Sequence, residues 1–536
     1  MSKTLKISSL MRRNLFFLLL LSAVLRAFLA GLLEFGNDEV YYFTYAMYPD
    51  LSYFDHPPMV GYIIRLFTFD LHFTQEFFVR LGAVTAGTIN TWIIFLIGRL
   101  MKDEVTGWNA ALLYTASIYG FIIAGVFILP DAPQSVFWLL SLYILLKALP
   151  DKSLNRQNRK RILLAGLTLG LAMLSKYTSA FLILGAGIYI LGYNRNWLKT
   201  REIYISILII ALVFSPVLIW NAYNDFISFG YQGGRAGIFA EGLNPVYFFT
   251  ELGGQILYNN PINWVLIIIS LLAFIRHKII ADTAMQRILL LTALPLVATF
   301  LFIALFRHTL PHWTGMAYIT LLPLVAVQLR KPGNERTSVI PKPLLVSLAV
   351  MLVIVLAGVS QVKLGWIKTD TGQTTIQSLG RNDPSLDMFG WRQLRDKMPS
   401  ILQRDLKAGI MNQNADFVSY RWFPAANIGY YVARPFDRKV FCIGKPEDIH
   451  QYAWINTYNG GFRKDMDMYF ITSSHDFKNP AELYAGYFNT IELSDTIPVI
   501  RDGTVTMNFF IYRLQKLKVL PKPFSIKSFS LDRPIQ

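Results

Sequence analysis

The sequence predicts an α-helical polytopic membrane protein that carries a smaller α/β domain at its carboxyl end. Hydrophobic residues make up 53% of the chain and charged residues only 16%, whereas soluble domains are about a quarter charged. Apolar runs of membrane-spanning length recur up to residue 361, and beyond it short strand-like and helix-like segments alternate. We therefore predict a membrane module at 1–361 with outer loops at 34–78 and 222–260, an α/β domain at 362–516 and a tail at 517–536.

The cysteine content and the net charge exclude several classes of protein. The chain has one cysteine, Cys442, which excludes an internal disulfide framework and a cysteine-based zinc site. Its formal net charge is +17, and basic loops that face anionic lipid account for such a charge in a multispan protein. We therefore expect membrane lipid, and not nucleic acid, as a partner.

Runs of roughly 20 apolar residues are long enough to cross a bilayer core of about 30 Å. Two longer apolar blocks must each fold back, because one continuous helix would exceed the thickness of the core. The block 107–149 is interrupted at Leu129-Pro130-Asp131, and the block 162–193 is interrupted by the polar segment 175–179. With these breaks the sequence predicts about eleven transmembrane helices, near 14–33, 79–99, 107–128, 131–149, 162–176, 178–193, 202–221, 261–276, 287–306, 312–329 and 341–361.

The distribution of basic residues predicts the orientation of these helices. With the amino terminus inside, the inner loops carry 21 lysines and arginines, and the outer segments before residue 362 carry 5. No small-residue cleavage site follows the first apolar run, so we expect an uncleaved first span. An odd number of spans then places residues 362–536 outside, on the same side as the loops 34–78 and 222–260.

The first outer loop combines carboxylates with a rigid turn. Asp38 and Glu39 are neighbours, so on a helix they point about 100° apart, and one can take part in chemistry while the other caps the helix. Asp55 and His56 precede Pro57-Pro58, which favours an extended, stiff turn. Carboxylates beside a bilayer are costly unless they have a function. We take Asp38 and Glu39 as candidate catalytic residues and Asp55 and His56 as pocket residues; the alternative is a solvated loop that caps a helix.

Basic side chains on outer segments are candidates for binding a phosphate: Lys176, Arg235, Arg307 and His308. An ammonium group is a good point-charge partner for phosphate, and Arg235 lies among glycines that let backbone amides approach a ligand. The alternatives are that Lys176 snorkels to the interface and that Arg235 belongs to a flexible loop. A divalent metal bound by His308 and His312 is a further alternative, although Pro311 breaks the helix that their spacing needs.

Further polar residues on outer segments are candidates for the pocket or for acceptor binding: Asp131, Asn221, Gln232, Gln255 and His312. Asp131 follows a proline, and its alternative role is to cap the helix that it begins. Asn221 and Gln232 belong to a loop rich in aromatic and amide side chains, and Gln255 shares a helical face with Glu251. Carboxylates opposite basic groups suit a reaction in which a lipid-linked phosphate leaves while a carboxylate deprotonates an acceptor hydroxyl.

The region after residue 361 predicts a small α/β domain that either recognises an acceptor, covers the pocket or only stabilises the protein. Expected strands are Phe417–Arg421, Asn427–Val432, Val440–Ile443, Met468–Ile471 and Thr506–Leu514. Expected helices are Gly390–Leu406, Asp448–Ala453 and Pro480–Tyr487. The tail from Leu517 is expected to be loosely ordered.

A series of short motifs resembles bacterial GT-C glycosyltransferases of the dolichyl-phosphate-mannose protein mannosyltransferase-like family, in the group that includes aminoarabinose transferase. The motifs are Asn37-Asp38-Glu39, Tyr53-Phe54-Asp55-His56-Pro57-Pro58, Leu129-Pro130-Asp131-Ala132-Pro133, Leu174-Ser175-Lys176-Tyr177-Thr178, Trp220-Asn221 through Gln232 to Arg235, Gly253-Gly254-Gln255 and Pro311-His312-Trp313. Weaker similarity reaches the outer domain at Gly390-Trp391, Tyr420 to Tyr431 and Gln451-Tyr452.

The resemblance implies a GT-C fold and transfer of a sugar from a polyprenyl-phosphate donor, with inversion, at the periplasmic face of the bacterial inner membrane. It matches Asp38 to the family's catalytic aspartate, and Lys176 and Arg235 to positions that hold the donor phosphate. Aminoarabinose transferases have Glu or Lys where this chain has Asp55 and His56, so the sugar and the acceptor (a glycolipid, a glycan or a protein) stay open. The alternatives are a transporter or flippase of lipid-linked saccharides, which predicts internal repeats and charges near mid-bilayer, and a structural membrane subunit.

Overall fold

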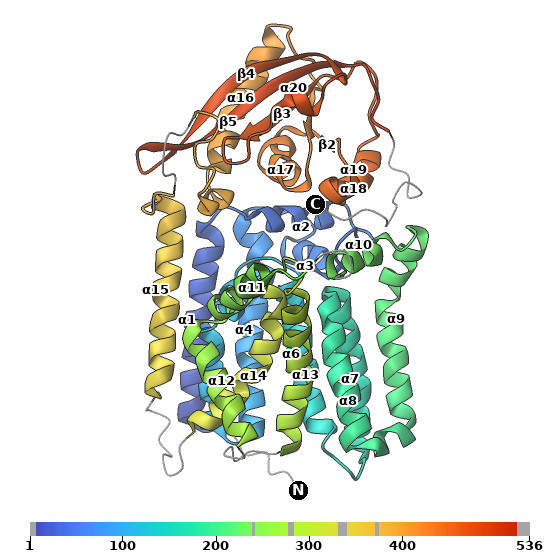
Figure 1. The fold of residues 1–536 in the computed structure, drawn as a ribbon, viewed down its shortest axis with the longest axis vertical. Coiled ribbons are helices and arrows are strands. Elements are labelled where there is room, and N and C mark those ends of the chain that lie inside the picture. Colours follow the sequence, from blue (N-terminus) through green and yellow to red (C-terminus); the bar gives the residue numbers. More distant parts are fainter. Residues whose placement is uncertain (1–6, 238–241, 277–282, 331–339, 370–374, 523–536) are drawn as a thin grey trace.

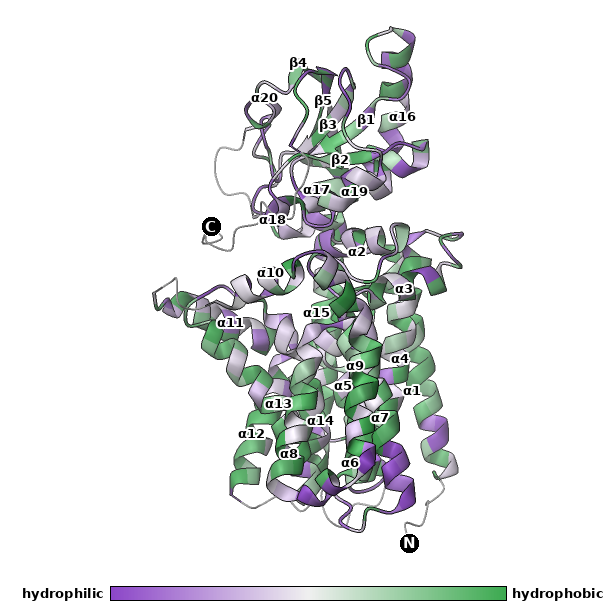
Figure 2. Cartoon of the chain, turned by 90° about the vertical axis from the view of Figure 1, so that its right-hand side faces the viewer, coloured by the Kyte–Doolittle hydropathy of each residue, from purple (hydrophilic) through white to green (hydrophobic). Residues whose placement is uncertain are grey.

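The computed structural model describes residues 7–237, 242–276, 283–330, 340–369 and 375–522. A bundle of roughly parallel helices makes up one part of the molecule, and a sheet domain lies over one end of it (Figure 1). The amino-terminal end of α1 (Ser9–Leu32) lies at the opposite end of the bundle. Hydrophobic residues predominate along the bundle, and hydrophilic residues gather at the end away from the sheet domain (Figure 2).

Among the described residues, five helices are long and apolar enough to cross a membrane: α1, α4 (Glu76–Met101), α9 (Arg201–Tyr223), α13 (Thr283–Ile303) and α15 (Lys342–Leu364). A sixth candidate is the pair α11 (Pro245–Tyr258) and α12 (Pro261–Ile275), which meet at 102°. The other predicted spans contain shorter or more polar helices, namely α5 (Glu104–Thr115), α6 (Asp131–Ala148), α7 (Arg156–Ser175), α8 (Ala180–Tyr193) and α14 (Gly315–Leu329). Every predicted span therefore contains a helix, and the number of eleven crossings stays a prediction.

The two apolar blocks that had to fold back do so, but not at the same kind of turn. α7 ends at Ser175, and a short 3-10 turn, Tyr177–Ser179, leads into α8. In the first block α5 already ends at Thr115, and a π-helical segment, Tyr119–Ile123, precedes the start of α6. This reversal is wider than the predicted break at Pro130, and the segment packs against the buried Arg26 of α1, whose guanidinium contacts the ring of Phe121 at 4.4 Å.

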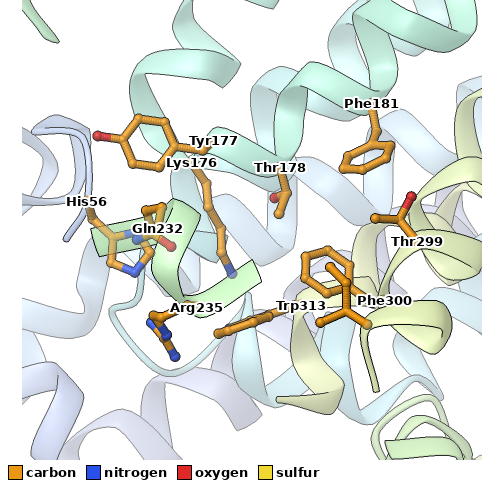
Figure 3. A pocket seen from close by; sticks show the side chains of 11 residues that line it. His56, Lys176, Tyr177, Thr178, Phe181, Gln232, Arg235, Thr299, Phe300 and Trp313 are labelled. Atoms are coloured by element: carbon orange, nitrogen blue, oxygen red, sulfur yellow. The ribbon is translucent and has the colours of Figure 1, made fainter. Parts of the chain in front are cut away.

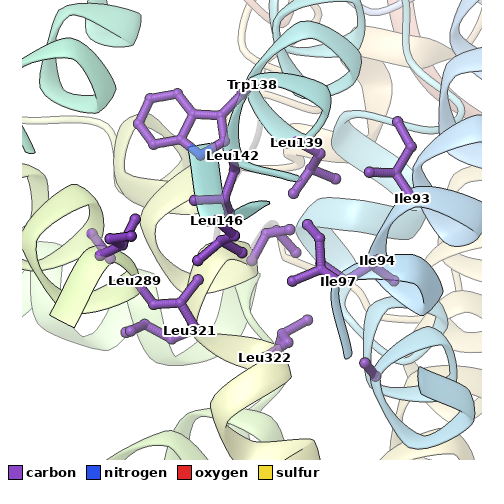
Figure 4. Close-up of a cluster of buried hydrophobic side chains, with 14 of the residues drawn as sticks. Ile93, Ile94, Ile97, Trp138, Leu139, Leu142, Leu146, Leu289, Leu321 and Leu322 are labelled. Atoms are coloured by element: carbon purple, nitrogen blue, oxygen red, sulfur yellow. The ribbon is translucent and has the colours of Figure 1, made fainter. Parts of the chain in front are cut away.

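A packed core holds the long helices together. It lies away from the end of the bundle that the sheet domain covers, which we call the outer end. Isoleucines of α4, leucines and Trp138 of α6, and leucines of α13 and α14 converge there (Figure 4). The members drawn and labelled are Ile93, Ile94, Ile97, Trp138, Leu139, Leu142, Leu146, Leu289, Leu321 and Leu322. These side chains are buried, so the bundle has a rigid interior on which the outer segments rest.

Four short helices lie across the outer end of the bundle, below the sheet domain: α2 (Asn37–Met47), α3 (Met59–Phe67), α10 (Ile227–Ala236) and α11 (Figure 1). A buried ion pair fixes the first of them. The Arg80 guanidinium on α4 donates to both carboxylate oxygens of Glu39 at 2.7 and 2.6 Å. Glu39 also accepts from the backbone amides of Gly36 and Ile128. Glu39 therefore caps α2 and joins it to two other segments of the bundle.

The sheet domain contains β1 (Asp416–Ser419), β2 (Val440–Cys442), β3 (Met468–Ser473), β4 (Phe488–Arg501) and β5 (Thr504–Leu517), in the order β2-β1-β3-β5-β4. The strands β1, β2 and β3 are parallel, and β5 runs antiparallel to β3 and β4. The main helices are α16 (Trp391–Lys407), α17 (Trp422–Asn427), α18 (Pro446–Ile449), α19 (Tyr452–Tyr458) and α20 (Pro480–Leu483).

One predicted strand of this domain was wrong, and one strand of the structure was not predicted. The segment Asn427–Val432 is not a strand: α17 continues into a π-helical stretch, Ile428–Ala433, that is almost wholly buried. A short apolar run that is buried on all sides cannot be assigned to strand or helix from periodicity. The strand β4 was not predicted, because it lies at the sheet edge and many of its side chains are exposed and polar. The predicted loose tail lies mostly outside the described residues, and β5 ends at Leu517.

The sheet domain and the bundle share one hydrophobic core. Phe35 and Tyr41 of the membrane module pack in the same cluster as Trp391 and Tyr431 of the sheet domain. Polar contacts cross the same boundary, such as the Phe35 amide donating to the Tyr431 hydroxyl at 2.8 Å. The interface between the sheet domain and the bundle is thus part of one continuous hydrophobic core.

We predict that Arg80→Ala lowers the free energy of unfolding by about 3–5 kcal/mol, since it leaves the carboxylate of Glu39 buried without its partner. The measurement is reversible unfolding of the purified chain in detergent. The control is Arg395→Ala, which removes an exposed pair with Asp396 and should cost less than about 1 kcal/mol. Equal stability of the two variants would contradict the structural role of the buried pair.

Candidate active site

A cavity of about 280 Å³ lies at the outer end of the bundle, where α8, α10 and α13 meet. One end of it is lined by His56, Lys176, Gln232 and Arg235, and the other end by apolar and aromatic side chains (Figure 3). The apolar end contains Phe181 of α8, together with Thr299, Phe300 and Ile303 of α13 and the nearby Trp313. The cavity is therefore amphipathic, with cationic groups at one end only.

Lys176 is held in place by a buried carboxylate. Its ammonium group contacts the two oxygens of Asp131 at 2.8 and 2.7 Å, and the hydroxyl of Tyr119 donates to Asp131 at 2.7 Å. Lys176 is 5% exposed and Asp131 is 2% exposed. A buried charge of this kind is stable only when it is paired. Asp131 thus fixes the ammonium at the cavity wall, and its place at the start of α6 agrees with this role.

Arg235 reaches the cavity from α10. Its guanidinium lies over the rings of Trp313 at 4.6 Å and Tyr231 at 5.5 Å. Next to it on α10, Gln232 donates to the backbone carbonyl of Asp55 at 2.6 Å. Arg307 donates to the carbonyl of Gly234, so this predicted phosphate ligand supports α10 and is not among the residues that line the cavity.

Asp55 and His56 lie beside these cations. The hydroxyls of Tyr41 and Tyr45 both donate to one oxygen of Asp55, at 2.8 and 2.6 Å. Burial raises the pKa of Asp55 in spite of these two hydrogen bonds. His56 lines the cavity, and burial together with the charges of Lys176 and Arg235 lowers its pKa well below the usual value. His56 is therefore a neutral imidazole at physiological pH.

Asp38 is exposed on the first turn of α2. It does not line the cavity itself, but it lies close enough to the charges of Asp55, Arg235 and Asp131 to be affected by them. Desolvation by the surrounding protein raises the pKa of Asp38 to about 6, and the negative charge of Asp55 is the second largest contribution to this shift. A carboxylate with such a pKa is suited to accept a proton near neutral pH.

The remaining predicted site residues are distributed around this group. His312 lies near Tyr258, and burial and the charge of Lys176 lower its pKa to about 4. Gln255 is fully buried and bonded to Glu251 and to the Tyr318 hydroxyl. Asn221, also fully buried, donates to the carbonyl of Val217, as a helix-terminal residue does.

His308 is exposed and contacts the ring of Tyr247. Neither His308, Gln255 nor Asn221 lines the cavity. In the described part of the chain, no three His, Cys, Asp or Glu side chains are placed to hold a metal ion.

Several residues around the site had no signal in the sequence. Tyr119 is an ordinary aromatic in an apolar run, yet it completes the contacts of Asp131. Phe181, Phe300 and Ile303 are indistinguishable from lipid-facing residues until their helices are packed together. The motif Pro311-His312-Trp313 did contain a signal for Trp313 as a partner of Arg235, because an indole is the best ring for a cation–π contact with an arginine.

Residues 55–220 match the family described as dolichyl-phosphate-mannose-protein mannosyltransferase. This segment includes Asp55, His56, Asp131 and Lys176. The crystal structure of ArnT from Cupriavidus metallidurans in the apo state is similar to the whole molecule, with a TM-score of 0.58 and 12% identity over 93% of this chain and 98% of that chain. The chain has the GT-C fold.

Two further relatives agree with this result. The crystal structure of the same ArnT bound to undecaprenyl phosphate matches with a TM-score of 0.57 and 12% identity, over 92% of this chain and 97% of that chain. Lipid A galacturonosyltransferase RgtD of Rhizobium johnstonii is 24% identical over 312 residues, which are 57% of this chain. The chain spans 63% of the length of RgtD. The resemblance to GT-C proteins and the predicted fold class are confirmed, and the chain is a multi-pass membrane protein.

Proposed function

We propose that this GT-C protein transfers a sugar from a polyprenyl-phosphate donor to an acceptor hydroxyl or phosphate, with inversion of the anomeric carbon. The observation that carries this proposal is the amphipathic cavity, in which Lys176 and Arg235 lie at one end and Phe181 and Phe300 at the other. A lipid phosphate needs both kinds of surface. The structure of ArnT bound to undecaprenyl phosphate supports the choice of a polyprenyl phosphate.

The donor phosphate binds between Lys176 and Arg235. Lys176 supplies a compact ammonium group, and Arg235 supplies a planar donor group that suits phosphate oxygens. Because Asp131 already neutralises part of the Lys176 charge, the bound phosphate shares the ammonium with it. The first isoprene units of the donor lie along Phe181, Phe300 and Ile303, where α8 begins and α13 ends.

The reaction exchanges one carbon–oxygen bond for another. The acceptor oxygen attacks the anomeric carbon from the face opposite to the phosphate, and its proton passes to the carboxylate of Asp38. The bond between the anomeric carbon and the phosphate oxygen breaks, and the polyprenyl phosphate leaves with the bonding electrons. Lys176 and Arg235 stabilise the charge that develops on this leaving group. His56 lines the cavity beside the donor phosphate, and Asp55, which precedes it, lies on the acceptor side.

The other predicted residues take supporting roles. Glu39 was a candidate catalytic residue, and its engagement by Arg80 and two backbone amides favours its predicted alternative, that of capping α2. Arg307 supports α10, and His308 is placed outside the donor site. Basic residues are concentrated at the end of the bundle away from the sheet domain. This distribution favours a cytoplasmic amino terminus and a periplasmic site in the inner membrane. Of the 21 basic residues counted on this side, Lys3, Lys6, Lys278, Lys331 and Arg336 lie outside the described residues.

The acceptor is an envelope glycolipid, glycan or protein. Lipid A galacturonosyltransferase RgtD favours a lipid A-type glycolipid. Mass spectrometry of envelope glycolipids from cells with and without the gene identifies the sugar and the acceptor together. An unchanged glycolipid, glycan and protein profile would contradict the proposal.

Replacing Asp38 by Asn should lower turnover by about 10²–10⁴-fold, because general-base help is lost while the shape of the side chain is kept. The measurement is release of polyprenyl phosphate in proteoliposomes that contain donor and acceptor lipids extracted from native membranes. Binding of undecaprenyl phosphate serves as the control and should stay within a factor of about two. Full turnover in Asp38→Asn would exclude Asp38 as the base.

The pH dependence of turnover should follow the protonation of Asp38. Its pKa is raised to about 6, and the base works only when deprotonated, so activity should fall as the pH drops through about 6. Asp55→Asn keeps an oxygen for Tyr41 and Tyr45 but removes a negative charge that raises the pKa of Asp38. The acidic limb of the pH–rate profile should therefore move to lower pH in this variant. An unmoved limb would contradict the electrostatic coupling.

Replacing Lys176 by Ala should weaken binding of undecaprenyl phosphate by about 10- to 100-fold, the value of a hydrogen bond to a charged group. Titration of the purified protein in detergent measures this change. His308→Ala is the matched control, because it removes a basic residue of the same outer face that does not line the cavity. A larger effect of His308→Ala than of Lys176→Ala would move the phosphate site away from the cavity.

A further inference from the structure

The sheet domain places two neighbouring residues, His450 and Gln451, against the outer segments of the bundle. His450 adopts φ of 48° and ψ of −128°, a conformation that is costly for a residue with a side chain. Both side chains are almost fully buried. A backbone hydrogen bond at Glu447 acts on the His450 imidazole, whereas Nε2 of Gln451 has no hydrogen-bond partner in the part of the chain that the structure describes. Backbone strain clusters at functional sites, and a buried polar atom without a partner calls for an explanation.

His450 contacts the segment that carries Arg235. Its Nε2 atom lies 3.3 Å from the hydroxyl of Tyr231 on α10, and the ring of Tyr231 lies beneath the guanidinium of Arg235. The imidazole is itself held by a stack on Trp422 with ring centroids 5.4 Å apart. His450 of the sheet domain therefore contacts the tyrosine whose ring packs against Arg235, at the cationic end of the cavity.

Gln451 contacts the segment that carries Asp55. Its Oε1 accepts from the backbone amide of Phe54 at 3.0 Å, and its own backbone amide donates to the hydroxyl of Tyr41 at 3.3 Å. That same hydroxyl donates to Asp55. Gln451 therefore fixes both the backbone next to Asp55 and the orientation of one of its two tyrosine donors.

The topology of the sheet explains why these two residues lie beside the bundle. The strands β1, β2 and β3 are parallel, and β1 lies between the other two, so the chain passes from β1 to β2 on one side and then crosses to β3 on the other side. Trp422 follows the carboxyl end of β1, and His450 follows that of β2. In open α/β sheets such an edge is where ligands and functional groups gather.

We infer that the sheet domain completes the active site, with His450 and Gln451 as positioning residues that act on its two halves. His450 positions Tyr231 and through it Arg235, on the donor-phosphate side. Gln451 positions Phe54 and Tyr41 and through them Asp55, on the acceptor side. This inference rests on the proposed function for its activity readout, and on the phosphate site alone for its binding readout.

The test separates the two halves of the site. His450→Phe keeps the aromatic stack but removes the contact to Tyr231, and it should weaken binding of undecaprenyl phosphate by about fivefold. Tyr231→Phe should have the same effect, and the double variant should be no weaker than either single one, because both act through one contact. Gln451→Met should leave this binding unchanged but lower the rate of sugar transfer by about tenfold or more, since it misplaces the acceptor side.

The matched control is Tyr430→Phe, which removes another hydrogen bond across the same boundary, from the Tyr430 hydroxyl to the carbonyl of Thr74. It should change neither binding nor transfer. Wild-type binding in both His450→Phe and Tyr231→Phe would overturn the inference for His450, and wild-type transfer in Gln451→Met would overturn it for Gln451. Equal losses in Tyr430→Phe would reduce both residues to general docking contacts. If the wild-type chain transfers no sugar, the proposed function fails, and the binding experiment still decides the role of His450.

Discussion

The ammonium group of Lys176 is buried at the end of the bundle next to the sheet domain, and the arrangement of the contacts around it follows from the need to compensate its charge. Asp131 contacts it with both oxygens, and Tyr119 supports Asp131 from a π-helical segment. The same segment packs against the buried Arg26, and a side chain at Gly87 or Gly125 would collide with the Arg26 guanidinium. The contacts that hold the Lys176 ammonium thus extend into the packing of the bundle.

A second set of contacts brings the carboxylates to the same place. Arg80 and Glu39 fix the start of α2, which carries Asp38 on its first turn. The tyrosines of α2 hold Asp55, and α10 bonds to the backbone of the same loop through Gln232. Acid and cation therefore come from separate segments, each anchored by its own buried polar contact. Such anchoring limits the motion of the reacting groups and lowers the reorganisation that catalysis requires.

The convergence of the outer segments could be predicted because the order of the membrane spans assigns each loop to one side of the bundle before any contact is known. The count of basic residues was enough to predict that Asp38, Lys176 and Arg235 lie on the same side. The engagement of Glu39 as a cap of α2 was also foreseen as one of two alternatives, since neighbours on a helix point apart; a catalytic role of Asp38 stays a prediction. The pairing of Lys176 with Asp131 was not predictable, because it depends on the depth at which α6 starts and α7 ends. Gln451 stood only in a weak motif and His450 in none, because their role arises only from the docking of two domains.

The central claim is that one cavity binds the phosphate of a polyprenyl lipid between Lys176 and Arg235. A cryo-electron microscopy structure of the chain in lipid nanodiscs with undecaprenyl phosphate tests it most directly. We expect the phosphate within about 4 Å of the Lys176 ammonium and the Arg235 guanidinium, with the isoprenoid chain along Phe181 and Phe300. A phosphate bound elsewhere, with this cavity empty or filled only by a bilayer acyl chain, would contradict the account.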